Sequence, residues 1–217
     1  VTGYKSMTAD NTLYNVATSV QETPTDAWTA KGTNVGEYPV GIESKDFKNT
    51  NANFTNVEFV VVDGALKIDP VTAKVTVTVT GNTASEKYDG TEKTASGYGV
   101  SISNEKYTEA DFEFKGNAEV KGTDANTYPM GLTAANFTNK STNFTNVEFV
   151  VTDGSLTINK RNVTLTSASD SKVYDGTPLT NDTVTIGGDG FVAGEGAEYN
   201  VTGTQTNVGS SDNTFTY

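Results

Sequence analysis

Residues 32–69, GTNVGEYPVGIESKDFKNTNANFTNVEFVVVDGALKID, recur without a gap as residues 122–159, GTDANTYPMGLTAANFTNKSTNFTNVEFVVTDGSLTIN. About half of the aligned positions are identical. A second echo links residues 74–91, KVTVTVTGNTASEKYDGT, with residues 160–177, KRNVTLTSASDSKVYDGT. The chain is therefore built from an internal repeat of about 85 to 90 residues.

The repeat predicts three domains along the chain. Residues 71–159 form one complete repeat unit, residues 1–70 an N-terminally incomplete unit and residues 160–217 a C-terminally incomplete unit. A weaker echo between residues 33–36 and 206–209 extends the pattern into the third unit. The phase of a repeat does not follow from its period, so the folded boundaries stay open.

Local sequence predicts strands nearly everywhere. Val and Thr alternate strictly in residues 75–80, which places the Val side chains on one face and the Thr side chains on the other. Residues 59–68 and 149–158 predict β-hairpins, because Asp63-Gly64 and Asp153-Gly154 separate β-branched runs and suit type I′ turns with positive φ at both central residues. Composition agrees, since about 37 Thr and about 6 Leu favour strands over helices.

Helical structure is expected only as single turns. Residues 44–47 and 133–137 each predict one turn that buries its Phe, capped by Ser44 and Thr133 respectively. A third turn is expected at residues 108–112.

Two Tyr-Asp-Gly-Thr strings predict anchored turns. In each, Tyr buries its ring, Asp accepts local backbone N–H groups and Gly takes a positive φ. The residues concerned are Tyr88, Asp89, Gly90, Tyr174, Asp175 and Gly176.

Composition excludes whole classes of function. The chain has no Cys and no His, which removes disulfides, thiolate nucleophiles, Cys/His zinc sites and His-dependent catalysis. Its net charge of −12 makes nucleic acid and anionic membrane surfaces poor partners. No apolar run is long enough to insert into a membrane, and we expect any secretion or anchoring signal to lie outside these residues.

The motifs KVYDGT, KGT-x-x-x-x-YP and F-x-N-x-x-x-NFTNVEFVV-x-DG-x-L-x-I resemble the tandem YDG-type and MBG-type repeats of large bacterial surface proteins, which are familiar from Gram-positive gut bacteria. The resemblance implies a mainly β fold of tandem small β-sandwich or β-grasp-like modules, arranged as an elongated rod. It also implies an extracellular adhesin at the cell surface or cell wall, with no catalytic residues. Short connections at residues 68–71 and 158–161 suit such a rod, and Pro70 stiffens the first.

Three functions are compatible with this reading. The first is a non-catalytic stalk, whose partners are the neighbouring repeat modules of the same chain. The second is direct binding of a host glycoprotein such as mucin or immunoglobulin, or of a glycan, for which Trp28 in residues 24–28 is the distinctive aromatic. The third is a carboxylate-based glycosidase, which would need two convergent acidic residues.

The sequence is compatible with two further kinds of site. Lys74 and Lys160 recur at the first strand and could supply the amine of a Lys–Asn isopeptide bond, with Glu148 as the promoting acid. Calcium is the most plausible metal, because residues 124–126 and 187–190 form oxygen-rich loops. Neither loop has the full calcium-binding pattern with its bidentate Glu, so no cofactor is expected.

Overall fold

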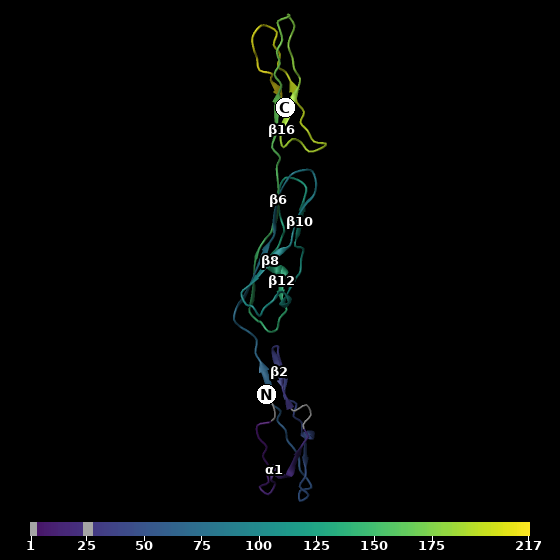
Figure 1. Ribbon diagram of the computed structural model, residues 1–217. Helices are drawn as coiled ribbons and strands as arrows, with labels where there is room; N and C mark the ends of the chain where they lie inside the picture. Colours follow the sequence, from purple (N-terminus) through teal and green to yellow (C-terminus); the bar gives the residue numbers. More distant parts are fainter. Residues whose placement is uncertain (1–3, 24–27) are drawn as a thin grey trace. The chain divides into compact units, whose positions relative to one another are not determined.

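The computed structural model describes residues 4–23 and 28–217. They are mainly β with short helical segments (Figure 1), which confirms the predicted mainly β class. The chain forms two compact units: unit 1 comprises Val1–Thr76, Ile102–Glu113 and Thr138–Glu148, and unit 2 comprises Val77–Ser101, Phe114–Phe137 and Phe149–Tyr217. Each unit combines segments that are far apart in sequence. These units are defined by contacts and not by the sequence repeat, so the repeat boundaries at residues 70 and 159 stay a prediction.

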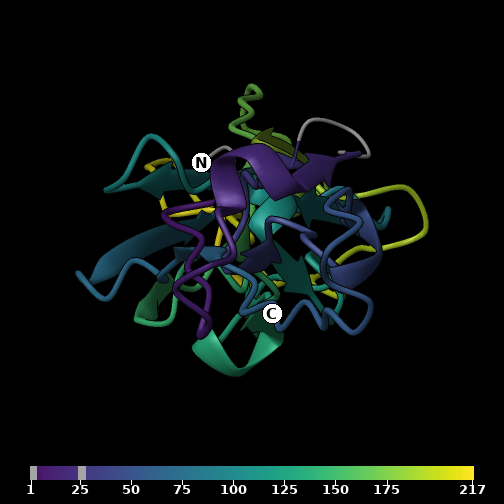
Figure 2. The ribbon, with the colours of Figure 1, turned by 90° about the horizontal axis from the view of Figure 1, so that it is seen from below.

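Unit 1 is assembled from small antiparallel sheets and single helical turns. Strand β1 pairs with β3, and β2 pairs with β4. The short helix α1, purple in Figure 2, begins after Asn15, whose side chain accepts the Ala17 N–H. The elements are α1 (Val16–Ser19), β1 (Val20–Glu22), β2 (Gly36–Pro39), η2 (Ser44–Asp46), β3 (Phe47–Asn49), β4 (Ala65–Ile68) and η3 (Glu109–Asp111).

The remaining strands lie in unit 2 or contribute to both units. Strand β14 is central in a three-stranded sheet, antiparallel to β11 and parallel to β6. Strand β7 pairs with β10, β15 with β16 and β17 with β18, all antiparallel. The bounds are β5 (Val75–Gly81), β6 (Thr83–Lys87), β7 (Lys93–Ser96), β8 (Tyr98–Ile102), β9 (Phe112–Phe114), β10 (Glu119–Gly122), β11 (Thr127–Pro129), η4 (Ala134–Asn136), β12 (Phe137–Asn139), β13 (Val147–Thr152), β14 (Ser155–Asn159), β15 (Val163–Ser167), β16 (Val184–Gly188), β17 (Asn200–Val201) and β18 (Phe215–Thr216).

The alternation predicted for residues 75–80 is confirmed in β5. Val75, Val77 and Val79 are fully buried, whereas Thr78 and Thr80 on the opposite face are exposed. A second buried cluster lies in unit 2 where β14 meets its neighbours, and Leu156 and Ile158 of β14 belong to it. Apolar side chains at alternate strand positions thus build the core.

The two hairpins predicted at Asp-Gly are wrong. Strand β13 joins β5 and β8 in one sheet, whereas β14 joins β11 and β6 in another, so the chain changes sheets at residues 153–154. In the first repeat, β4 pairs with β2, and residues 57–64 carry no strand. Neither Gly64 nor Gly154 has a positive φ, so neither turn is of type I′.

The Asp153-Gly154 step is a corner fixed by contacts from distant parts of the sequence. The Asp153 carboxylate accepts the backbone N–H groups of Gly131 at 2.9 Å and Leu132 at 2.7 Å. A Cβ at Gly154 would lie 2.4 Å from the carbonyl oxygen of Asn82. Position 154 therefore requires glycine, because the backbone of Asn82 lies too close for a side chain. Position 153 favours Asp, because its carboxylate bonds two backbone N–H groups.

The same corner recurs in unit 1. The Asp63 carboxylate accepts the N–H groups of Gly41 at 2.9 Å and Ile42 at 3.1 Å. These bonds, above all that from Gly41, hold the pKa of the Asp63 carboxyl below its usual range. The corner is thus a repeated structural element of the chain.

The three predicted helical turns are present as the 3-10 turns η2, η3 and η4. Thr133 caps η4 as predicted. The cap predicted at Ser44 is wrong: Glu43 occupies that position, because its backbone N–H bonds the Asp46 carboxylate at 2.9 Å. The Phe that follows each turn, Phe47 or Phe137, is buried as predicted.

Tyr107 makes unit 1 sensitive to alkaline pH. Burial raises the pKa of Tyr107 from 10.0 to about 12, so the folded state favours the neutral phenol more than the unfolded state does. The contribution to stability is present below pH 10 and is lost as pH rises through 12. We expect the urea midpoint of unit 1, followed by fluorescence, to fall across this range. The midpoint of Tyr107→Phe should fall less, because phenylalanine cannot ionise. An equal fall of the midpoint in both proteins would contradict the prediction.

Candidate functional site at the repeat joint

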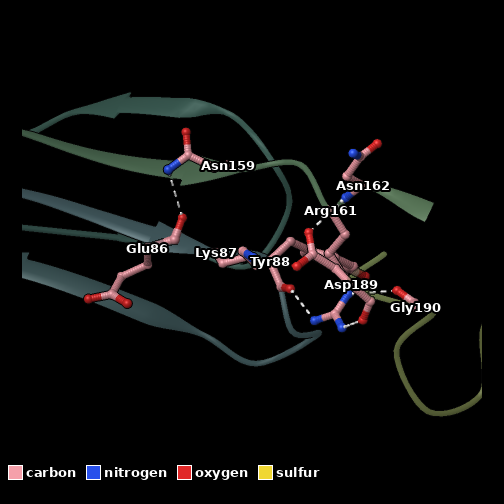
Figure 3. Close-up of polar contacts among 8 residues, drawn as sticks. All are labelled: Glu86, Lys87, Tyr88, Asn159, Arg161, Asn162, Asp189 and Gly190. Atoms are coloured by element: carbon pink, nitrogen blue, oxygen red, sulfur yellow. Dashed lines mark hydrogen bonds and ion pairs between the residues drawn. The ribbon is translucent and has the colours of Figure 1, made fainter. Parts of the chain in front are cut away.

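A polar cluster gathers where β14 ends and β15 begins (Figure 3), and we call it the joint. It lies within unit 2 and combines the end of β6, the segment between β14 and β15 and the loop after β16. Its residues are Glu86, Lys87, Tyr88, Asn159, Arg161, Asn162, Asp189 and Gly190. The repeat assigns residues 86–88 and residues 189–190 to successive units.

Arg161 is the centre of the joint. Its Nε donates to the carbonyl oxygen of Gly190 at 2.8 Å, and its Nη1 donates to that of Tyr88 at 3.2 Å. Its Nη2 donates to the carbonyl oxygen of Asp189. A planar guanidinium offers five N–H donors in a fixed fork, so one half-buried side chain ties two loops together.

Asp189 adds a second connection. Its carboxylate accepts the Asn162 N–H at 2.9 Å and pairs with the Lys87 Nζ at 2.5 Å. These two donors, the backbone N–H first, hold the pKa of the Asp189 carboxyl below its usual range. The joint therefore stays charged and bonded at neutral pH.

Asn159 and Tyr88 complete the joint. The Asn159 side-chain amide donates to the Ser85 hydroxyl at 3.0 Å and the Glu86 carbonyl oxygen at 3.1 Å, which fastens the end of β14 to β6. The Tyr88 hydroxyl donates to the Glu195 carboxylate, and this bond raises the pKa of Tyr88. Sequence reasoning singled out neither Arg161 nor Asn159, although Arg161 is the sole arginine in the sequence and lies at the expected connection.

A different contact occurs in unit 1 between residues assigned to the first two repeats. Asn143 accepts the Val35 N–H at 2.7 Å through its Oδ1, and its Nδ2 donates to the Asn34 Oδ1 at 3.1 Å. No charged side chain takes part in these two bonds. The two contacts therefore use different chemistry for the same kind of connection.

The Tyr-Asp-Gly-Thr turns have nearly identical backbones. Asp89 accepts the Thr91 N–H at 2.9 Å, and Asp175 accepts the Thr177 N–H at the same distance. Gly90 and Gly176 have φ of 77° and 76°. The ammonium groups of Lys93 and Lys172, respectively, hold the pKa of the Asp89 and Asp175 carboxyls far below their usual range. Both Asp residues thus serve the turn geometry.

The two tyrosines of these turns differ. Tyr88 is half-buried and packs on the cluster that contains Leu156 and Ile158. Tyr174 is 61% exposed, so the expectation that it buries its ring is wrong. The difference follows from the neighbours, because residues 171–174 belong to no strand, whereas β6 directly before Tyr88 pairs with β14.

Trp28 lies in the core of unit 1. It is 6% exposed, its ring centroid lies 5.4 Å from that of Phe47, and its Nε1 donates to the buried Asp46 carboxylate at 3.1 Å. The expected ligand-stacking role is therefore corrected, since a buried ring offers no stacking face. The neighbouring residues 24–27 of that motif lie outside the described residues.

The structure brings Lys74 and Glu148 together as a surface ion pair. The Lys74 Nζ lies 2.6 Å from the Glu148 Oε2, and the side chains are 56% and 50% exposed. Lys160 is also exposed. A solvated ammonium paired with a carboxylate is not activated as a nucleophile.

We expect the intact mass of the chain to equal the mass calculated from its sequence. An isopeptide bond would remove one ammonia molecule, and the exposed setting of Lys74 and Glu148 does not promote that reaction. Mass spectrometry of the denatured protein measures this directly. Glu148→Gln should differ from the parent only by the substitution; a parent lighter by one ammonia would contradict the prediction.

Oxygen atoms in both calcium candidates accept hydrogen bonds from the protein itself. Within residues 4–23 and 28–217, no three acidic side chains cluster closely enough to hold a metal ion. The Asp189 carboxylate is bonded to Asn162 and Lys87, and the backbone oxygen of Asp124 accepts the Tyr128 hydroxyl at 3.0 Å. Of the helical segments in the described chain, none is long and apolar enough to cross a bilayer.

The strands, the recurring corner and the joint define a β-rich module held by polar contacts to the backbone. Residues 74–160 match the model of the MBG domain, so the chain contains an MBG domain over this range. No curated protein and no solved structure matches the chain.

Proposed function

We propose that the chain is the non-catalytic stalk of a surface adhesin, which spaces a distal binding domain from the cell wall of a Gram-positive bacterium. The observation that supports this most is the joint, in which Arg161 bonds carbonyl groups from two segments assigned to successive repeats. The MBG domain adds support, because it suggests a repeat-type domain of surface proteins. A stalk needs connections between modules that resist bending. A connection fixed by hydrogen bonds keeps a longer end-to-end distance than a flexible linker of the same number of residues.

The mechanism of such a stalk is mechanical. Each β module contributes a fixed length, since a strand rises about 3.3 Å per residue, whereas the ends of a flexible chain separate only with the square root of its length. The net charge of −12 favours solubility and repulsion between neighbouring stalks at high surface density. In this proposal the partners of each module are the adjacent modules.

A surface-display experiment tests the proposal. The 217-residue chain is placed between a cell-wall anchor and a fluorescent reporter domain, and the height of the reporter above the wall is compared with that given by a Gly/Ser linker of equal residue number. The proposal expects a greater and more uniform height for the chain. Equal heights would overturn it.

The alternative, direct recognition of a host glycoprotein such as mucin or immunoglobulin or of a glycan, loses its named anchor because Trp28 is buried. We expect no saturable binding on an array of such ligands. Saturable binding that survives Trp28→Phe would favour recognition over the stalk.

A further inference from the structure

A strand from the start of the complete repeat lies beside the strand at its end. Within residues 71–159, β6 directly follows the first strand, β5, and β14 is the last strand. The two pair in parallel, from Thr83 opposite Ser155 to Lys87 opposite Asn159. Since chain precedes and follows this repeat, tension along the chain reaches the pair through β6 on one side and β14 on the other.

The parallel direction decides how tension acts on the two strands. Tension pulls Thr83 toward the N-terminus of the chain and Asn159 toward its C-terminus, and these residues lie at opposite ends of the pair. The strands are therefore pulled past each other along their length, so the hydrogen bonds between them carry the load together. In a two-stranded hairpin the free ends are adjacent, and tension breaks the bonds one after another.

The corner at residues 153–154 produces this arrangement. A hairpin there would pair β14 with β13, whereas the corner carries the chain from the sheet of β13 to that of β6. Directly after the corner, the Ser155 N–H donates to the Asn82 carbonyl oxygen at 3.2 Å. At the other end of the pair, the Tyr88 N–H donates to the Asn159 carbonyl oxygen at 2.9 Å. Backbone bonds thus close the pair at both ends.

Side chains reinforce the pair of β6 and β14. The Asn159 amide donates across it to the Ser85 hydroxyl and to the Glu86 carbonyl oxygen, as Figure 3 shows for Glu86. Leu156 and Ile158 of β14 are 0% and 3% exposed, so one face of the strand is shielded from water. Shielding matters because water replaces a broken hydrogen bond and so eases its rupture.

Unit 1 contains a pairing in the same direction. Val71 and Phe144 form a parallel bridge. The Val71 N–H donates to the Asn143 carbonyl oxygen at 2.8 Å, and the Thr145 N–H donates to the Val71 carbonyl oxygen at 3.2 Å. In each unit, therefore, a segment from the start of the complete repeat pairs in parallel with a segment from near its end.

We propose that the pair of β6 and β14 is a mechanical clamp, which keeps the complete repeat folded when the chain is under tension. The clamp goes beyond the stalk proposal, because a stalk needs reach whereas a clamp resists stretching. It is a property of the folded repeat itself. The height of a displayed reporter does not measure it, so the two proposals succeed or fail separately.

The test compares two directions of pulling on the 217-residue chain with optical tweezers. Since the chain has no Cys, pairs of substitutions place the two handles at chosen exposed positions. Thr83→Cys with Lys160→Cys loads opposite ends of the clamp, whereas Glu86→Cys with Lys160→Cys loads one end and peels the strands apart. At equal loading rate we expect the first attachment to rupture at a force at least about twofold higher, because its hydrogen bonds break together.

Two further variants of the first attachment separate the clamp from general stability. Asn159→Ala removes the two side-chain bonds across the clamp and should lower the rupture force. Asn82→Ala removes a bond to the Ser96 carbonyl oxygen of β7, outside the clamp, and should leave the force unchanged. Urea unfolding verifies that all these proteins fold. Equal rupture forces for the two attachments would overturn the proposal, as would equal effects of Asn159→Ala and Asn82→Ala on the force.

Discussion

Trp28→Ala is expected to lower the free energy of unfolding of unit 1 by about 3–5 kcal/mol. Trp28 is 6% exposed and packs with Ala30, Val40, Ile42 and Phe47 in one buried cluster. Removing the indole leaves a cavity among these side chains and takes the Nε1 donor from the Asp46 carboxylate, which is itself 2% exposed. Urea unfolding followed by far-UV circular dichroism measures the loss.

Two controls interpret that result. Trp28→Phe keeps an aromatic ring but not the N–H donor, so it should lose about 1.5–3 kcal/mol for one hydrogen bond to a charged carboxylate, which still accepts the Glu43 N–H. Leu13→Ala alters an exposed apolar side chain of the same unit and should leave the midpoint unchanged. A midpoint in Trp28→Ala that equals that of the parent chain would contradict the assignment of Trp28 to the core.

Leu156→Ala is expected to destabilise unit 2 by about 2–5 kcal/mol. Leu156 is fully buried, and the side chains directly opposite it on the neighbouring strands, Tyr128 of β11 and Ala84 of β6, pack against its cluster. The cavity would lie beside Met130 and Leu132, which belong to the same cluster. Thermal and urea unfolding by circular dichroism give the magnitude.

Leu66→Ala is the matched control, because Leu66 occupies the position equivalent to Leu156 in the first repeat. Strand β4 pairs only with β2 in the described chain, and Leu66 is half-buried. Truncating Leu66 should lower the free energy of unfolding by about 1–2 kcal/mol, because a half-buried side chain loses less buried apolar area than a fully buried one. Equal losses for the two leucines would contradict the role assigned to the flanking strands.

The predictable part of the fold rests on patterns within a few residues. Strict Val–Thr alternation identified the buried face of β5, and Thr133 with the following Phe137 identified η4. The Tyr-Asp-Gly-Thr turns were readable for the same reason, since Asp89 bonds a residue only two positions away. Local hydrogen bonds leave a local signature in the sequence.

The mistaken part depends on contacts between distant residues. Asp153-Gly154 has the composition of a hairpin turn, yet its carboxylate serves Gly131 and Leu132, and its glycine makes room for Asn82. A single sequence does not show which donors lie unpaired nearby in space. For the same reason, the sequence did not predict the burial of Trp28 or the exposure of Tyr174, because both depend on which strands are adjacent in space.

The joint could not be predicted from the sequence, because the Arg161 side chain bonds backbone carbonyl groups. Carbonyl acceptors belong to every residue, so Tyr88, Asp189 and Gly190 carry no sequence signal as partners of Arg161. The available signal was the position of the sole arginine at the expected connection. Charged residues at a repeat junction are therefore worth testing as connectors before they are considered as surface charges.

The distribution of distances between spin labels at residues 150 and 186 tests the central claim most directly. Val150 in β13 and Ile186 in β16 are exposed and lie on opposite sides of the joint in sequence, and the chain has no other Cys to label. With Val150→Cys and Ile186→Cys, we expect one narrow distribution in the otherwise unaltered chain. Arg161→Ala should broaden it, and Arg161→Lys should give an intermediate width, because an ammonium is a compact charge and lacks the fixed fork of donors. A broad distribution in the unaltered chain, or a width unaffected by Arg161→Ala, would contradict a stalk held by its joint.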